Sequence, residues 1–150
     1  MRVVIQRVSE SAVVIEDEKV ASINKGLLIL LGIEIEDTKD DAVWLANKIS
    51  QLRIFSDEEG VMNKSILEVN AEVIVVSQFT LHAKTKKGNR PSYIKAARPE
   101  QAIPLYEQFK KDLSLSIGNE VQSGEFGADM QVLLINDGPV TILIDTKNKE

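Results

Sequence analysis

Residues 26–34, GLLILLGIE, form a nearly unbroken apolar run, the feature that most limits the folds open to this chain. Successive side chains of a β-strand point to opposite faces of the sheet, so a strand that is apolar at every position must be covered on both faces. A run this short and this rich in leucine and isoleucine is typical of a buried central strand. The chain is therefore expected to build its core around residues 26–34.

Other runs rich in β-branched and apolar residues predict further strands around this central one. They lie at residues 2–8, 12–16, 19–23 and 72–77, near 120–125, 130–135 and 140–145, with a short strand at 53–55. The polar residues Glu16, Asp17 and Glu18 predict a turn that makes a hairpin of two of these strands.

Two segments have the apolar spacing of helices. The first follows a capping box at Thr38–Asp41 and the second follows Pro99. Pro104 is expected to kink the second helix or to delay its regular part. Their apolar stripes are Ala42, Leu45, Ala46, Ile49 and Leu52, and Ala102, Tyr106, Phe109 and Leu113. With about eight strands and two helices, the chain is predicted to be an α+β protein with a largely antiparallel, partly closed sheet.

Bulk composition limits the compartment and the partners. The 150 residues favour a single domain, 1–150, with a real core. The apolar runs are far shorter than the ~20 residues of a membrane helix, and the first residues lack the pattern of a signal peptide. No cysteine is present, which fits a reducing cytoplasm, and the net charge of −5 argues against non-specific coating of nucleic acid. We therefore expect a cytoplasmic protein without a membrane partner.

Several common catalytic motifs are missing. The sequence has no dinucleotide-binding glycine pattern, no phosphate-binding P-loop, no G-x-S-x-G nucleophile motif and no H-E-x-x-H metal motif. His82 is the only histidine, so a multi-histidine metal site is excluded and a catalytic triad would have to use it. A lone histidine beside a strand end is more often a surface or packing residue than a catalytic one.

The first stretch with chemical potential is SQFTLHAKTKKGNRPSY, residues 77–93. A strand ends in hydrogen-bonding side chains, Ser77, Gln78 and Thr80, which can point into a cleft together with backbone N–H groups. The ordinary interpretation is a strand with a polar exit.

The loop that follows this strand carries four positive charges in seven residues, at Lys84, Lys86, Lys87 and Arg90. Clustered lysine and arginine side chains are suited to phosphates, and the glycine among them permits close approach. The alternative interpretation is a solvated basic loop.

The second stretch is SGEFGADMQVLLINDGPVT, residues 123–141. Proline cannot donate to a strand ladder, so Gly138–Pro139 predicts a strand start, an edge or a bulge. The simplest interpretation is a connector that begins a strand at Val140. Spacing alone does not predict a cis bond there, since X-Pro bonds are cis in only about 5–6% of cases.

Taken together, these segments resemble the D-aminoacyl-tRNA deacylase family. The residues that carry the resemblance are SQFTL (77–81), KGNRPSY (87–93), FGADM (126–130) and NDGPVT (136–141), and the opening RVVIQRVSESAVV is also similar. The resemblance spans nearly the whole chain. It implies a homodimer with a β-barrel-like sheet flanked by two main helices. Such a protein hydrolyses the ester between a D-amino acid and tRNA, accepts mischarged glycyl-tRNA, and uses no metal or organic cofactor.

The resemblance also implies roles for individual residues. Gly138–Pro139 is expected to be cis, to enter the partner subunit's pocket, and to exclude L-amino acids sterically while accepting the substrate's amino group. Arg7 is expected to support this motif across the interface, and Met130 is expected to line the pocket, although packing in the core is an equally good interpretation for Met130.

Catalysis is expected at the strand end. Backbone N–H groups near Phe79 and Thr80 would hold the ester carbonyl, Ser77 and Gln78 would order the adenosine, and the ribose 2′-OH would help activate water. Thr80 is the obvious side-chain candidate, but a threonine hydroxyl without a base is a poor nucleophile. The basic loop would then contact the acceptor stem of tRNA.

Two other hypotheses remain open at this stage. One is a non-catalytic RNA-binding module of similar fold, which has no need of Gly138–Pro139. The other is a metabolic hydrolase that uses Thr80 and His82.

Overall fold

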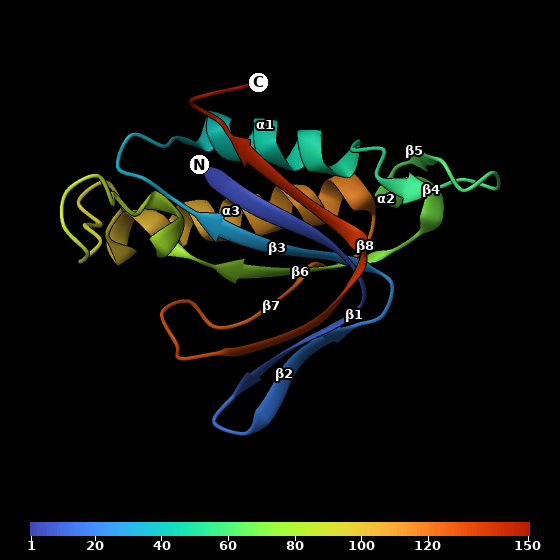
Figure 1. Cartoon of the computed structure of the whole chain (residues 1–150), viewed down its shortest axis with the longest axis horizontal. Helices are drawn as coiled ribbons and strands as arrows, with labels where there is room; N and C mark the ends of the chain where they lie inside the picture. Colours follow the sequence, from blue (N-terminus) through green and yellow to red (C-terminus); the bar gives the residue numbers. More distant parts are fainter.

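The structure, a computed structural model, describes residues 1–150, and its curved sheet carries two long helices on one side (Figure 1). The elements are β1 (Arg2–Ile15), β2 (Glu18–Ile23), β3 (Gly26–Gly32), α1 (Lys39–Ser50), β4 (Phe55–Ser56), β5 (Met62–Lys64), α2 (Ile66–Val69), β6 (Glu72–Ser77), a 3₁₀ turn η1 (Phe79–His82), α3 (Pro99–Ile117), β7 (Gln122–Ser123) and β8 (Gln131–Asp145). The predicted α+β class is confirmed.

The main sheet is mixed, whereas a largely antiparallel sheet was predicted. Its order is β2-β1-β3-β6-β7, with β8 paired to β1. The pairs of β1 with β2, β3 and β8 are antiparallel, while β3–β6 and β6–β7 are parallel. The parallel pairs follow from the long helical crossovers between those strands, since parallel neighbours cannot be joined by a tight turn.

The long strand β1 explains why the sheet curls into a barrel-like shape. Residues 2–8 lie between β3 and β8, and residues 11–14 lie between β2 and β8, so β1 changes one neighbour midway. The predicted separate strands at 2–8 and 12–16 are therefore one strand. The same holds for 130–135 and 140–145, which together form β8.

The central position of residues 26–34 is confirmed. On β3, Leu27, Ile29 and Leu31 belong to the large core under α1 and α3, while Leu28 belongs to a second cluster on the other face. Both faces of this strand are covered, as the unbroken apolar run requires.

The predicted helices are present. The α1 helix follows the expected capping box, in which the Asp41 carboxylate accepts the Thr38 N–H at 2.9 Å. The α3 helix begins at Pro99, and Pro104 lies inside it without delaying its start. The proline leaves only the i−4 carbonyl of Glu100 without its usual donor, and that residue is exposed to water. None of the helices combines the length and the hydrophobicity needed to cross a bilayer.

Candidate functional site

The segment after β6 makes a tight turn over the end of the sheet. Ser77 ends β6 opposite Leu31 of β3, and the Gln78 N–H donates to the Leu31 carbonyl at 2.8 Å. The next bond of the segment runs from the Leu81 N–H to the Gln78 carbonyl at 3.2 Å. The N–H groups of Phe79 and Thr80 precede that bond, so they have no acceptor within the turn. The role predicted for these two N–H groups, holding an ester carbonyl, stays a prediction.

The side chains of the turn are arranged for binding more than for nucleophilic attack. The Gln78 amide donates to the Thr80 hydroxyl, which leaves the hydroxyl proton free to donate elsewhere. The Phe79 ring is 55% exposed and meets the Tyr93 ring edge to face at 5.0 Å between centroids. The strand predicted to carry Ser77, Gln78 and Thr80 ends at Ser77, and the 3₁₀ turn begins at Phe79.

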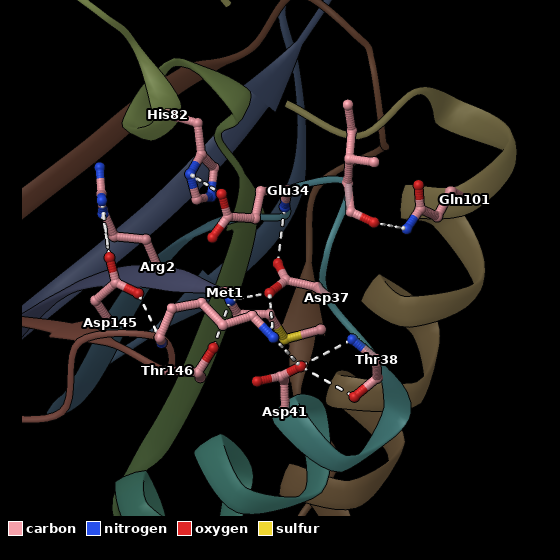
Figure 2. Close-up of polar contacts among 12 residues, drawn as sticks. Met1, Arg2, Glu34, Asp37, Thr38, Asp41, His82, Gln101, Asp145 and Thr146 are labelled. Atoms are coloured by element: carbon pink, nitrogen blue, oxygen red, sulfur yellow. Dashed lines mark hydrogen bonds and ion pairs between the residues drawn. The ribbon is translucent and has the colours of Figure 1, made fainter. Parts of the chain in front are cut away.

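His82 is buried rather than presented to solvent. It is 3% exposed, its Nδ1 atom lies 4.0 Å from the Glu34 carboxylate, and its Nε2 atom has no hydrogen-bond partner (Figure 2). No hydrogen bond joins His82 to the Thr80 hydroxyl, whose partner is Gln78. No group of three or more His, Asp or Glu side chains is placed to hold a metal ion. The arrangement offers no nucleophile and base pair at Thr80.

Gly138–Pro139 forms a bulge between the two apolar halves of β8. It is a cis peptide within β8, where the register against β1 jumps, so that Gln6 pairs with Thr141 but Val8 pairs with Asn136. Residues 137–139 form an exposed bulge. Asn136 closes its base by accepting the Val140 N–H at 2.8 Å.

Arg7 holds this bulge from beneath. Its side chain is 9% exposed, and its Nε donates to the Asp137 carbonyl at 2.9 Å while Nη1 donates to the Ile54 carbonyl at 2.7 Å. The Asp137 carboxylate lies 3.5 Å from Nε. These contacts of Arg7 with the bulge are made within one chain, and support across an interface stays a prediction.

The Phe79–His82 turn and the Gly138–Pro139 bulge lie at different places along β1. The turn is held beside Arg2, whose guanidinium binds the Leu81 carbonyl, and the bulge is held by Arg7. Five residues of a strand span roughly 16 Å. The turn and the bulge are therefore held by two different arginines of β1.

Met130 and the basic loop at residues 84–90 lie in different surroundings. Met130 is partly buried and packs against the second core cluster, near Gly124 and Val13. The basic loop is exposed from Lys84 to Arg90 and is closed by two backbone hydrogen bonds between Lys84 and Ser92, of 2.8 and 3.0 Å. The packing of Met130 agrees with its core interpretation, and the loop presents its charges to solvent.

Sequence reasoning missed the polar network that connects both chain ends to the turn (Figure 2). The buried α-ammonium group of Met1 binds Asp37 and donates to the Thr146 hydroxyl at 2.6 Å. Nearby, Arg2 forms a salt bridge with Asp145 at 2.8 Å. No local motif marks these residues, because the contacts join opposite ends of the chain.

The surroundings of the Asp145 carboxylate lower its pKa. Burial opposes its ionisation, but hydrogen bonds from the Lys147 N–H and from Arg2 outweigh burial and lower its pKa below the ordinary value. Asp145 is thus a stable anion beside Arg2.

Comparisons with known proteins give consistent results. A family model described as D-Tyr-tRNA(Tyr) deacylase matches residues 4–145. A protein of Bacteroides fragilis (strain YCH46), named D-aminoacyl-tRNA deacylase, is 67% identical over 150 residues, covering 100% of both chains. One from Flavobacterium johnsoniae, of the same name, is 61% identical with the same coverage.

Solved structures show the same fold. One, named "c-Myc DNA Unwinding Element Binding Protein", has a TM-score of 0.90 and 39% identity, covering 97% of this chain and 98% of the other. Another, described as a probable eukaryotic D-amino acid tRNA deacylase, has a TM-score of 0.81 at 17% identity, covering 95% and 97%.

Proposed function

The chain belongs to the D-Tyr-tRNA(Tyr) deacylase family, and on this premise we propose that it hydrolyses the ester bond of D-aminoacyl-tRNA. The products are free D-amino acid and reusable tRNA, and the reaction serves as chiral proofreading for translation. The observation that carries this proposal is full-length similarity, at 67% identity, to a relative named D-aminoacyl-tRNA deacylase.

The working unit is proposed to be a homodimer in which Gly138–Pro139 of one chain enters the pocket of the other. The outward face of β8 supports this arrangement, since Leu133, Ile135 and Leu143 are 52%, 54% and 64% exposed. Apolar side chains gathered on one exposed face are typical of an interaction surface. The bulge lies between them on the same strand, so a partner bound there would receive it.

Selectivity is proposed to come from exclusion of the wrong enantiomer. The substrate's α-ammonium group binds main-chain carbonyls of the Gly138–Pro139 bulge, and the ester carbonyl is fixed at the Phe79–His82 turn. With the ribose also held, only one direction remains for the side chain. A D side chain projects outward along it, whereas an L side chain collides with the Gly138–Pro139 backbone.

A filter of this kind is indifferent to the identity of a D side chain. It also cannot reject an amino acid that has no side chain, so mischarged glycyl-tRNA is a substrate as well. Gly138 suits this position because a Cβ would intrude on the pocket, and Met130 is proposed to line its wall.

The chemical step is proposed to rest on positioning and electrostatics. The N–H groups of Phe79 and Thr80 stabilise the developing oxyanion, and the terminal ribose 2′-OH helps to activate water. Ser77 and Gln78 order the adenosine. The burial of His82 and the hydrogen bond from Gln78 to Thr80 support this mechanism over a threonine nucleophile with a histidine base.

The basic loop after η1 is the proposed contact with tRNA. The exposed side chains of Lys84, Lys86, Lys87 and Arg90 are proposed to contact acceptor-stem phosphates, a contact that salt would weaken. Residues 1–150 are proposed to act as one deacylase domain. The cytoplasm is the proposed location, which the absence of cysteine suits.

A second candidate function is nucleic-acid binding without catalysis. It is favoured by one observation, that the solved structure at 39% identity is named for binding to a DNA unwinding element. Such a role needs the basic loop but neither the Gly138–Pro139 bulge nor the free N–H groups of the turn.

The test is hydrolysis of D-tyrosyl-tRNA and L-tyrosyl-tRNA in parallel by the purified protein. The proposal predicts rapid release of D-tyrosine and retention of L-tyrosine on the tRNA. Binding of both substrates without hydrolysis would favour the second candidate, and equal hydrolysis of both would contradict chiral proofreading.

A further inference from the structure

Three residues form a row across the sheet beneath the Phe79–His82 turn. Arg2 of β1 pairs with Gly32 of β3 on one side and with Asp145 of β8 on the other. Residues paired across neighbouring antiparallel strands point to the same face of a sheet. This Gly32–Arg2–Asp145 row therefore presents one small residue, one cation and one anion to the segment above it.

Gly32 allows the turn to lie directly on the sheet. A Cβ added there would come within 2.9 Å of the Gln78 carbonyl oxygen and 3.0 Å of side-chain atoms of Leu81 and His82. Any larger residue would therefore push the turn outward.

Arg2 binds both the turn and Asp145, and Figure 2 shows its contact with Asp145. Its Nη1 donates to the Leu81 carbonyl at 2.7 Å, while Nε and Nη2 donate to one carboxylate oxygen of Asp145 at 3.0 and 2.8 Å. The guanidinium fork is planar, so the salt bridge to Asp145 fixes the direction of the remaining donor. Asp145 thereby orients Arg2, and Arg2 orients the turn.

The bond from Arg2 to the Leu81 carbonyl is made at the C-terminal end of the turn. The last carbonyls of a short helical turn receive no hydrogen bond from the turn's own N–H groups, and a basic side chain can supply one. Leu81 follows Thr80 directly, so a shift of its carbonyl also shifts the N–H groups of Phe79 and Thr80.

Given the proposed deacylation, on which this step rests, we propose that Arg2, oriented by Asp145, is a positioning residue for the reaction. It holds the Phe79–His82 turn so that its N–H groups meet the ester carbonyl. Arg2 touches no reacting atom in this scheme. Displacing the reacting groups by about 1 Å lowers the rate on the order of 100-fold. A loosened turn is therefore expected to lower mainly kcat.

The first experiment measures backbone amide hydrogen exchange in the wild-type protein and in Arg2→Gln. The matched control is Arg53→Gln, which removes another arginine that donates to a main-chain carbonyl, that of Asn63 at 2.8 Å. Arg2→Gln is expected to speed exchange at Leu81 and Ala83, whose N–H groups bond within the turn. Arg53→Gln is expected to leave both unchanged.

The second experiment measures kcat and KM on D-tyrosyl-tRNA for the same variants, together with Asp145→Asn and Arg2→Lys. We expect Arg2→Gln to lower kcat by roughly 10-fold to 100-fold while KM changes by no more than about twofold. Arg2→Lys is expected to recover little, because lysine cannot make the fork. Arg53→Gln is expected to match the wild type.

The outcomes separate this proposal from the proposed function. A wild-type protein that does not hydrolyse D-tyrosyl-tRNA overturns the proposed function. Unchanged exchange at Leu81 and Ala83 in Arg2→Gln, or an unchanged kcat in an otherwise active protein, overturns the positioning role of Arg2.

Discussion

Arg7 donates through Nε to the main-chain carbonyl of Asp137 at 2.9 Å, one residue before the cis Gly138–Pro139 bond. The same guanidinium also donates to the Ile54 carbonyl, so the bulge of β8 is fastened to the body of its own chain. The proposed exclusion of L-amino acids requires a main-chain barrier that does not move. Arg7 and Asn136 provide that rigidity from below and from the base of the bulge.

Replacing Arg7 with glutamine is expected to loosen the bulge and to lower stability. The Ile54 and Asp137 carbonyls would lose a charged donor, and an unsatisfied buried group costs about 1–3 kcal/mol. Thermal unfolding measures the loss of stability, and hydrolysis of D-tyrosyl-tRNA at a temperature where the variant is folded measures the loss of activity. Full activity in a folded Arg7→Gln protein would show that the bulge needs no such support.

Gly138→Ala is expected to impair hydrolysis of D-aminoacyl-tRNA. Gly138 has φ of +143°, which L residues rarely adopt, and an added Cβ would lie 2.8 Å from a Val140 methyl and 3.1 Å from the Arg7 guanidinium. The bulge must therefore shift, and the added methyl also crowds the proposed pocket. A suitable control is Gly127→Ala, where φ is also positive but no atom lies within 4 Å of the new Cβ. Equal rates for Gly138→Ala and the wild type would argue against the proposed contact.

His82→Ala is expected to retain deacylation within a few-fold of the wild-type rate. The imidazole is buried and is not hydrogen-bonded to the Thr80 hydroxyl. Its removal therefore leaves a cavity but takes no general base away from Thr80. The variant is expected to melt at a lower temperature, because large-to-small changes in a packed interior cost about 2–5 kcal/mol. Abolished hydrolysis in a folded variant would instead support a hydrolase that uses Thr80 and His82.

Asp37→Ala is expected to destabilise the fold strongly while leaving the site residues in place. Asp37 pairs with the fully buried α-ammonium of Met1 and accepts the Glu34 N–H at 2.7 Å. Removing one partner of a buried ion pair typically costs about 3–5 kcal/mol. Chemical denaturation measures this loss, with Glu107→Ala as a control, since that residue's pair with Lys110 is at the surface. Similar losses in the two variants would contradict a structural role for the buried pair.

Acid is expected to weaken the contribution of Asp145. Its pKa is lowered in the folded state, so the folded protein holds fewer protons there than the unfolded chain near its ordinary pKa of about 4. The stabilisation is therefore complete above about pH 4 and is lost as the pH falls below it. Melting temperatures of wild type and Asp145→Asn should differ at neutral pH and converge on acidification. A constant difference across this range would contradict the assignment.

Local sequence patterns predicted much of the fold because local physics decides it. The apolar run at 26–34 requires two covered faces, and the capping box at Thr38–Asp41 starts α1 where expected. The mixed pairing was missed because strand order depends on which distant segments meet, as in the parallel contact of β3 with β6. The continuity of β1 and β8 was missed because a bulge can pass a polar or proline-containing stretch without ending a strand.

The candidate site was only partly accessible from the sequence for the same reason. The polar side chains at a strand end and the Gly138–Pro139 pair can be recognised in the sequence. The supports are not, because Arg2, Gly32 and Asp145 lie far apart in the chain and meet only through strand register.

The proposed pocket forms from the Phe79–His82 turn of one chain and the Gly138–Pro139 barrier of its partner. Subunit complementation tests it most directly, by mixing Thr80→Pro, which lacks one donor of the turn, with Gly138→Ala. Each variant alone is expected to be far less active than the wild type on D-tyrosyl-tRNA. A mixed dimer pairs the intact turn of one chain with the intact barrier of the other.

Equal mixing followed by subunit exchange is therefore expected to restore about a quarter of the wild-type rate on D-tyrosyl-tRNA, because half the dimers have one intact pocket of two. L-tyrosyl-tRNA should remain intact. A mixture as inactive as its separate components, with mixed dimers verified by mass, would contradict a pocket shared between two chains.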